Sequence, residues 1–545
     1  MQYFLRLSRK VGLGIYTDVT SRIPYYAQDF KDAWNYRVIP LTIFVFFTNL
    51  LPAIAFAQDM FDRTNNAYGV NEILFSSALA GVVFGLFLGQ PLCIVGVTGP
   101  IAIFSYTVYD LIKDRGTPYF PFMCWIYLWS MIMHLVMALL NWVSYLSFIT
   151  NFSCDVFGFF INFVYLQKGV QILSRQFEHS VAGGFCSVML SILMVVFGVG
   201  SQVFGSQLHY FNHHVRKVFV DYGVPMSVIF FSGFMHFGGY LNNVDLQRLP
   251  ITTAFEPTAG KDPLVRPHGW FIHFWPNTNI SWGDVFLAIP FGVLLTILFY
   301  FDHNVLSLMC QAKRYPLKKP SSFHYDFALL GITTGIAGLL GFPAPNGLIP
   351  QAPLHTESLL VHDRHGRVKE VVEQRLTNTL QGVATFIFMT KPFLHVLGLI
   401  PQAILAGLFF TMGINGLDSN IVVDRIRFHF LDPRYIELDS CPVKFKQMAQ
   451  IGSKKWPMVY TVLQVIAGMC EFVITLTKAA IGFPAVLIFY AICAKWVWPK
   501  FIPKEYLTQL DGEVADEVII RNLQLIRDDD TQSDLEDGDA SQKEE

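Results

Sequence analysis

Two apolar stretches of the chain contain more glycine and proline than a continuous membrane helix tolerates. The first runs from Gly89 to Phe104 and the second from Gly341 to Pro353, and both begin with the pattern Gly-X-Pro. Lipid offers no hydrogen-bond partner to a broken backbone, so such breaks occur where the freed amides face a cavity lined by protein. Interrupted segments in corresponding positions of two halves are typical of a transporter's substrate site. Two proline-kinked helices that only pack against their neighbours are the alternative.

The chemistry expected of these stretches is anion binding by backbone amides. Helix should resume within 96–100 in the first stretch and near 350–353 in the second. Each half-helix would direct its free N–H groups and the positive end of its dipole into a shared cavity, from opposite sides. Such a site holds an anion without a full positive side chain. The candidate substrate-binding residues at these two points are Gly96, Thr98, Gly99 and Gln351.

Asp302 is the strongest candidate among the individual side chains. It follows the apolar span 285–300, and a carboxylate at membrane depth is costly and indicates function by default. We expect it to couple transport to protons or ions; an aspartate at a helix end in the membrane interface is the alternative. Its neighbour His303 is expected to be solvated. Gln58 and Asp59 end the first span as Asp302 ends the eighth, so Gln58 is a further substrate-binding candidate, whereas Asp59 fits the cavity and the surface equally well.

Composition places the chain in a membrane and excludes several functions. Hydrophobic residues make up 53% and charged residues 15% of the 545 residues, and a soluble domain is about a quarter charged. The net charge of −2 does not fit a nucleic-acid-binding protein. The eight cysteines are scattered without a C-x-x-C pair, so neither disulfides nor a metal site is expected, and no cofactor is implied. The chain has no P-loop or H-E-x-x-H motif, which disfavours a primary pump and an enzyme.

Hydropathy divides the chain into fourteen expected spans. Seven lie within 41–240 and seven within 284–500, and a polar loop at 241–283 separates the two sets. The third span of each set is broken, and an odd number of spans inverts the second set. We therefore expect an all-α polytopic membrane protein, built as a 7+7 inverted repeat with two half-helices. Glu72 and Lys168 are expected to determine topology and packing.

The ends of the chain should lie in the cytosol. Residues 1–40 are basic and precede the first span, which by the positive-inside rule puts this segment on the cytosolic side or in its interface. Residues 501–545 end in an acidic run and are expected to form a disordered cytosolic tail. With seven spans between the N-terminus and the 241–283 loop, that loop is extracellular, and Asn279 in the sequon Asn-Ile-Ser is a glycosylation candidate.

A series of ordered sequence blocks resembles the bicarbonate/borate transporter family, which includes the anion exchangers of animals and the borate exporters of fungi and plants. The resemblance covers the chain from about residue 11 to residue 510. The blocks are Leu51–Phe56, Gly69–Leu74, Gly89–Pro100, Asp221–Pro225, Phe299–His303, Phe323–Asp326, Leu340–Pro343 and Val372–Arg375. Two departures from the animal exchangers favour the fungal borate exporters: the large cytosolic N-terminal domain is absent, and Gln351 stands where those exchangers have an arginine.

The resemblance implies a division of the spans into two domains. The core domain would comprise 41–150 and 284–392, with spans 1–4 and 8–11, and the gate domain would comprise 151–240 and 393–500. It further implies a homodimer through the gate domain and an elevator-like movement of core against gate.

The function that the resemblance implies is secondary-active export of borate or boric acid across the plasma membrane. Thr98 and Gln351 can both donate and accept hydrogen bonds, which suits tetrahydroxyborate, and the missing arginine suits a ligand that is neutral part of the time. Proton coupling through Asp302 is a hypothesis. The alternatives are a bicarbonate or other small-anion exchanger and, in a different class, a membrane sensor or scaffold that transports nothing.

Overall fold

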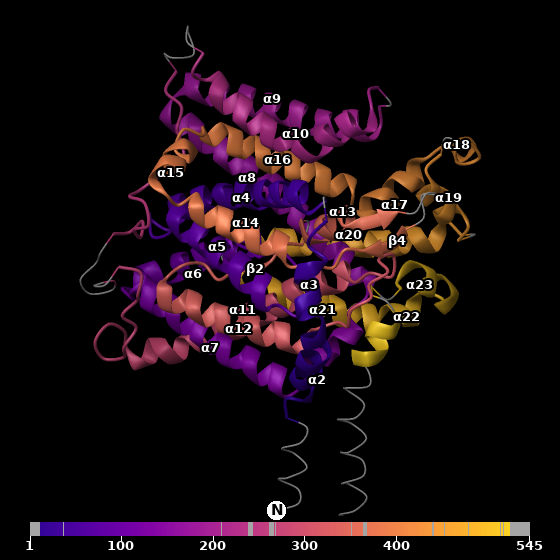
Figure 1. Ribbon diagram of the computed structural model, residues 1–545, viewed down its shortest axis with the longest axis horizontal. Helices are drawn as coiled ribbons and strands as arrows, with labels where there is room; N and C mark the ends of the chain where they lie inside the picture. Colours follow the sequence, from indigo (N-terminus) through magenta and orange to yellow (C-terminus); the bar gives the residue numbers. More distant parts are fainter. Residues whose placement is uncertain are drawn as a thin grey trace, which may run out of the picture.

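The computed structural model describes residues 11–523 apart from short gaps. The gaps are at 36, 209, 238–243, 261–265, 267–268, 350, 363–367, 439–440, 452, 478, 513 and 516. The described chain is almost entirely helical, and its long helices lie side by side in layers (Figure 1).

The elements of the two halves follow the expected order. In the first half they are α2 (Leu13–Arg22), α3 (Tyr26–Lys31), α4 (Val38–Arg63), α5 (Val70–Phe87), β1 (Val95–Gly96), α6 (Gly99–Ile112), α7 (Tyr119–Leu139), α8 (Asn151–His179), α9 (Val181–Ser206) and α10 (His213–Phe234). In the second half they are α11 (Trp282–Cys310), α12 (His324–Leu340), β2 (Asn346–Gly347), α13 (Gln351–Ser358), β3 (Leu360–His362), β4 (Val368–Val371), α14 (Leu376–Ile387), α15 (Lys391–Leu397), α16 (Gln402–Asp418), α17 (Ile421–Phe430), α18 (Pro433–Ile436), α19 (Val443–Ala449), α20 (Lys455–Thr475), α21 (Phe483–Trp496), α22 (Trp498–Phe501) and α23 (Lys504–Leu510).

The described part of the chain holds nine helices that are long and apolar enough to cross a membrane. The number is ten if α14 and α15, which meet at an angle of 89°, count as one broken span. The expectation of an all-α polytopic membrane protein is therefore confirmed. The continuous eleventh span expected over 376–390 is wrong, because the chain bends sharply after Ile387.

Two helices run further than their apolar sequences indicated. α4 continues to Arg63 and α11 to Cys310, so Asp59 and Asp302 lie inside helices rather than after them. Both polar stretches are buried, Asp59 at 0% and Asp302 at 1% exposure, because they face other helices and not lipid. Hydropathy alone ends a span at its first charged residue and misses this kind of continuation.

The long helices pack in three groups. α7 lies against α11 and α12; α14 lies against α4 and α5; and α8 lies against α9, α16 and α20. Figure 1 shows α9 and α10 at one edge of the molecule and α7 at the opposite edge, with α4, α5 and α14 between them. β1 and β2 join segments from the two halves of the chain.

The segment after the last long helix is ordered further than expected. α22 and α23 follow directly, and Leu510, Ala515 and Leu523 are buried. Asp511 accepts a hydrogen bond from the backbone N–H of Phe152 at the start of α8, at 2.9 Å. The prediction of a disordered tail over 501–545 is therefore wrong for 504–510 and for the buried positions up to 523; residues 524–545 lie outside the described part.

Candidate functional site

The two broken segments meet in the middle of the structure. β1 and β2 pair antiparallel, with Val95 opposite Gly347 and Gly96 opposite Asn346. The backbone N–H of Leu348 donates to the carbonyl oxygen of Ile94 at 2.9 Å. This pairing provides hydrogen-bond partners for backbone that has left its helix, as burial requires.

Each broken segment ends in a short helix whose first turn is similar. Ala102 N–H donates to the Thr98 carbonyl oxygen in α6, and Ala352 N–H donates to the Leu348 carbonyl oxygen in α13. The first amides of a helix have no partner within it, which makes both starts potential anion-binding points. Pro100 lacks an N–H, so Gly99 and Ile101 carry the free amides of α6.

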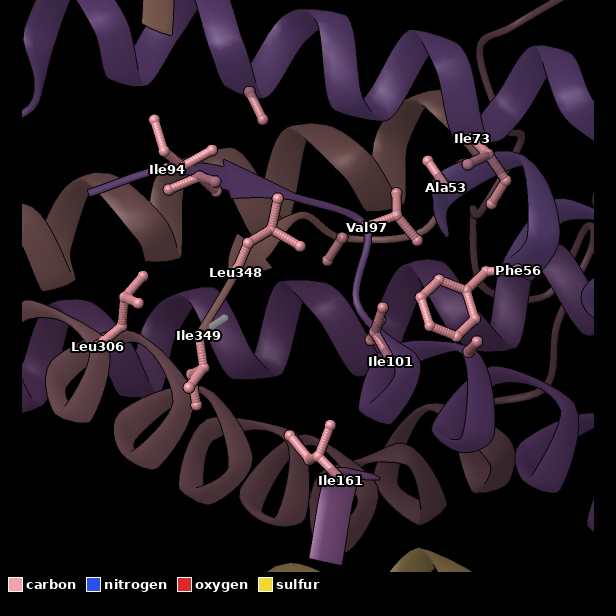
Figure 2. Packing of buried hydrophobic residues seen from close by; sticks show 14 of the residues in the cluster. Ala53, Phe56, Ile73, Ile94, Val97, Ile101, Ile161, Leu306, Leu348 and Ile349 are labelled. Carbon is pink, nitrogen blue, oxygen red and sulfur yellow. The ribbon is translucent and has the colours of Figure 1, made fainter. Parts of the chain in front are cut away.

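A small cavity lies where the two helix starts face α8 and α11. Its lining comes from the first segment, from α8, from α11 and from the second segment: Thr98, Pro100, Ile161, Tyr165, Asp302, Gly347, Leu348 and Ile349. The centre of a water-sized sphere can move through about 10 Å³ of it, roughly what one water molecule needs. Figure 2 shows the apolar wall, with Ile101 and Val97 beside the turn into α6, and with Leu348 and Ile349 on the chain that follows β2.

Asp302 brings the negative charge to this cavity, as predicted. Its Oδ2 accepts a hydrogen bond from Asn346 Nδ2 at 3.0 Å, and Asn346 Oδ1 in turn accepts from the N–H of Gly347 at 2.8 Å. The other carboxylate oxygen, Oδ1, is buried and has no hydrogen-bond partner in the described part of the protein. A buried carboxylate oxygen without a partner is costly unless a ligand, water or proton completes it.

Thr98 lines the cavity, and Gly96, Gly99 and Gln351 lie near it without forming its wall. The Thr98 hydroxyl is buried at the start of α6, and none of the described residues is a hydrogen-bond partner for it. Gly96 belongs to β1, and the ring of Phe56 approaches Gly99 closely: a Cβ there would lie 3.2 Å from it. Gln351 donates to the Thr48 carbonyl oxygen at 3.2 Å, and its own amide oxygen is buried with no partner among the described groups.

Gln58 lies away from the cavity wall. It is 1% exposed and donates to Asp62 Oδ1 at 2.9 Å, beside an ion cluster at the far end of α4. Asp59 belongs to this cluster and contacts Lys168 Nζ at 2.8 Å and an Arg175 nitrogen at 2.9 Å. The structure thus separates Gln58 and Asp59 from Asp302, and the ends of the first and eighth spans are not equivalent.

Three further expectations concern residues outside the cavity. His303 is 1% exposed, so the prediction of a solvated histidine is wrong: α11 continues past it and α5 covers it through Phe84. Glu72 accepts from the Thr258 backbone N–H at 2.7 Å and thereby holds the 241–283 loop against α5. Asn279, the glycosylation candidate, is partly buried and donates to the His273 carbonyl oxygen at 3.0 Å; its modification stays a prediction.

Sequence reasoning missed Asn346 and the two α8 residues Ile161 and Tyr165. The signal for Asn346 was present, because Pro100 and Pro350 are 250 positions apart and the same shift takes Gly96 to Asn346. For the α8 residues nothing in the local sequence distinguishes the face that meets the cavity. Within the described ranges, no group of three or more His, Cys, Asp or Glu side chains is arranged to hold a metal ion.

Comparisons with known proteins agree with this architecture. The model of the HCO3− transporter integral membrane domain family matches residues 9–183 and 183–515. The chain is 53% identical to Boron transporter 1 of Saccharomyces cerevisiae over 95% of its own length and 89% of that protein. It is 26% identical to the human Band 3 anion transport protein over 92% of its own length, and it spans 56% of that longer protein.

Solved structures support the fold at lower identity. The transmembrane domain of the cyanobacterial bicarbonate transporter BicA superimposes with a TM-score of 0.51 at 13% identity, covering 82% of this chain and 98% of that one. The structure of SLC26A9 gives a TM-score of 0.51 at 10% identity and covers 88% of this chain and 68% of that one. With a family model that matches nearly the whole length and a relative of such high identity, the chain belongs to the HCO3− transporter integral membrane domain family and is a membrane transporter, not an enzyme.

Proposed function

We propose that this protein exports borate or boric acid from the cell by secondary-active transport. The observation that carries the proposal is the cavity at the meeting point of the broken segments. It joins a hydroxyl, a carboxylate oxygen and helix N-terminal amides, all without partners in the described structure. A polyhydroxyl ligand with donors and acceptors matches this set better than a bare anion does. The name of the yeast relative, Boron transporter 1, supports the same substrate.

The charge at the cavity supports a ligand that is not permanently anionic. Asp302 is the only charged side chain in the described wall, and a carboxylate repels a bound anion unless one of the two carries a proton. Boric acid binds hydroxide to form tetrahydroxyborate, so a proton exchanged with Asp302 could accompany each transport event. Proton coupling through Asp302 is part of the proposal.

The transport mechanism that we propose is alternating access between two domains. The core would comprise α4–α7 and α11–α14, and the gate α8–α10, α16, α20 and α21, in a 7+7 inverted repeat of fourteen spans. The packing supports this repeat. α5 lies against α14 as α12 lies against α7, and α4 lies against α14 as α11 lies against α7. Both are pairs that an exchange of the two halves interconverts. The remaining spans would be α6, α12, α13 and α16, of 14, 17, 8 and 17 residues.

An elevator-like slide fits the position of the cavity between the proposed domains. Thr98, Asp302 and Leu348 would belong to the core, whereas Ile161 and Tyr165 on α8 would belong to the gate. A slide of core past gate would carry the binding residues and exchange the wall that covers them. We also propose a homodimer through the gate domain, both chain ends in the cytosol and a plasma-membrane location, in keeping with a role in boron efflux.

Exchange of bicarbonate or another small anion is the second candidate. The human relative is named an anion transport protein, and helix N-terminal amides can hold any small oxyanion. In this alternative the apolar wall around Thr98 would exclude water from a smaller, permanently charged ligand.

Boron content in cells that lack their own exporter tests the proposal. We expect cells that express the protein to hold several-fold less boron than cells with the empty vector, after growth in the same borate medium. Elemental analysis of washed cells gives the boron content, and surface labelling confirms that the protein has reached the plasma membrane. Equal boron in both cell lines would contradict borate export; flux of labelled bicarbonate into proteoliposomes would then test the second candidate.

A further inference from the structure

A buried ion cluster connects α4 and α6 to α8 one helical turn beyond the cavity. Asp59 of α4 contacts Lys168 Nζ at 2.8 Å and Arg175 of α8 at 2.9 Å. Lys168 also donates to the Tyr106 hydroxyl of α6 at 2.8 Å, and its ammonium lies 4.5 Å from the centre of that ring. The side chains of Asp59 and Lys168 are 0% and 2% exposed. Arg175 also pairs with Asp62, which belongs to α4.

An aromatic layer separates this cluster from the cavity. The Phe56 ring lies 6.1 Å from Tyr165 and 5.3 Å from Phe409, measured between ring centres. Tyr165 lines the cavity on one side of the layer. Asp59 follows Phe56 by three residues on α4, and Lys168 follows Tyr165 by three on α8, so the ions lie about 4.5 Å further along both helices. The order is therefore cavity, aromatic layer and ion cluster.

The cluster marks the end of the molecule opposite α2 and α3. α4 begins just after α3, and Asp59 lies about 30 Å along it at 1.5 Å per residue. At the same end Arg63 pairs with Asp110, at 3.2 Å, where α6 approaches the surface. A ligand that left the cavity at this end would have to pass both the aromatic layer and the ions.

We propose that the Asp59–Lys168–Arg175 cluster is a latch that closes this end of the transport path. The inference rests on the proposed function, since α4 and α6 would belong to the core and α8 to the gate. A buried ion pair contributes little when intact, because the cost of desolvation offsets its attraction, but it is costly to leave one charge buried without its partner. Once water enters, both charges are solvated and the cost disappears. The latch therefore disfavours partly opened states and makes opening a two-state event.

A second buried cluster in the protein provides a matched control. Lys319 contacts Asp29 at 2.7 Å and Asp32 at 2.8 Å, and Asp29 also pairs with Arg375 at 2.8 Å. Asp29 is 0% exposed, as Asp59 is, and each would keep one arginine partner if its lysine were removed. This control cluster joins α3 to the segments before α12 and α14, which would all belong to one domain and do not move apart in the proposed slide.

The test is the labelling rate of a cysteine in the cavity. The protein carries Thr98→Cys in a parent in which the exposed Cys470 and the partly exposed Cys186 are serine; the other six cysteines are buried. A membrane-impermeant thiol reagent is added on the side at which a second reporter, Asp114→Cys, is labelled. Asp114 is exposed and lies near Asp110 at the same end, so it sets the maximum rate.

We expect slow labelling in the parent and a rate at least about tenfold higher with Lys168→Met, because Asp59 is then left buried with one cation fewer. The double variant Asp59→Asn with Lys168→Met buries no uncompensated charge and should return the rate to within about threefold of the parent. Lys319→Met should lower thermal stability in detergent by an amount similar to Lys168→Met and leave the labelling rate within about threefold of the parent.

Four outcomes would overturn the latch: parent labelling as fast as Asp114→Cys, no change with Lys168→Met, an equal increase with Lys319→Met, or a double variant as fast as the single. Labelling does not require borate, so the result is independent of the proposed substrate. A parent without borate flux in which the labelling pattern holds would retain the latch and reject the exporter. Borate flux together with unchanged labelling would do the reverse.

Discussion

The two broken segments share a backbone and differ in their side chains. A shift of 250 positions, 346 minus 96, superimposes the paired residues Gly96 and Asn346 as well as the helix-start residues Thr98 and Leu348. The first segment thus offers a hydroxyl at its helix start where the second offers a methyl-bearing side chain. The second offers an amide on its strand where the first has no side chain. Equivalent backbones with different side chains make a polar site that is asymmetric across the repeat.

The helices that face these strands extend the difference. Asn346 bonds to the carboxylate of Asp302 on α11. On the other side Asn49 of α4 lies against Gly96, with its amide oxygen 2.7 Å from the position that a Cβ would take, and it donates nothing to a charge there. The charge is therefore confined to the second half, whereas the free hydroxyl is confined to the first. We read this as a division of work: the second half handles the charge of the ligand, and the first handles its hydroxyl groups.

Removal of the charge should have the largest effect on this division. Asp302→Ala is expected to lower borate flux in proteoliposomes by at least about 100-fold, since an intramembrane carboxylate at a cavity is retained for function. Asn346→Ala keeps the carboxylate and removes its donor, and a hydrogen bond to a charged group contributes about 1.5–3 kcal/mol, so a loss of about tenfold or more is expected. Normal flux in Asp302→Ala, with protein that runs as a single species in gel filtration, would contradict the assignment.

Removal of the hydroxyl should have a smaller effect. Thr98→Val has the same shape without the oxygen, and a neutral hydrogen bond to the ligand is worth about 0.5–1.5 kcal/mol, which corresponds to a loss of roughly two- to tenfold. Thr98→Ser keeps the hydroxyl and should retain most of the flux. The comparison of initial flux rates over a range of borate concentrations separates weaker binding from slower transport. Equal flux in the valine and serine variants would show that the first half contributes backbone alone.

A positive charge added near the second segment should change preference more than rate. Gln351→Arg introduces a permanent cation beside α13, where we expect the ratio of bicarbonate to borate flux to rise a few-fold because a permanently charged anion gains more from it. Competition between the two ions in the same proteoliposomes measures the ratio. Gln351→Lys carries the same charge with a different shape and serves as the control; an unchanged ratio in both would exclude an effect of Gln351 on selectivity.

Much of the fold could be predicted because hydropathy and helix-breaking residues are local signals. They located the long helices, both broken segments and Asp302. The lengths of α4 and α11 could not be predicted in this way, since Asp59 and Asp302 are buried by partners far away in the sequence. Lys168 carried an overlooked signal: a lysine inside a span needs an anion, and Asp59 is a carboxylate at the end of another span. The bend between α14 and α15 depends on packing that no local pattern encodes.

The pairing of β1 with β2 has a consequence for how the protein is made. The partner of Gly96 is translated 250 residues later, which at about 5–20 residues per second leaves its backbone waiting for roughly 10 to 50 seconds. During that time the first broken segment is in the membrane with unpaired amides, which lipid does not tolerate. The nascent first half must therefore hold this segment in water or against the insertion machinery until the second half arrives. Biogenesis of the site is a late event, and a pause in synthesis between the two halves would prolong the most vulnerable state of the chain.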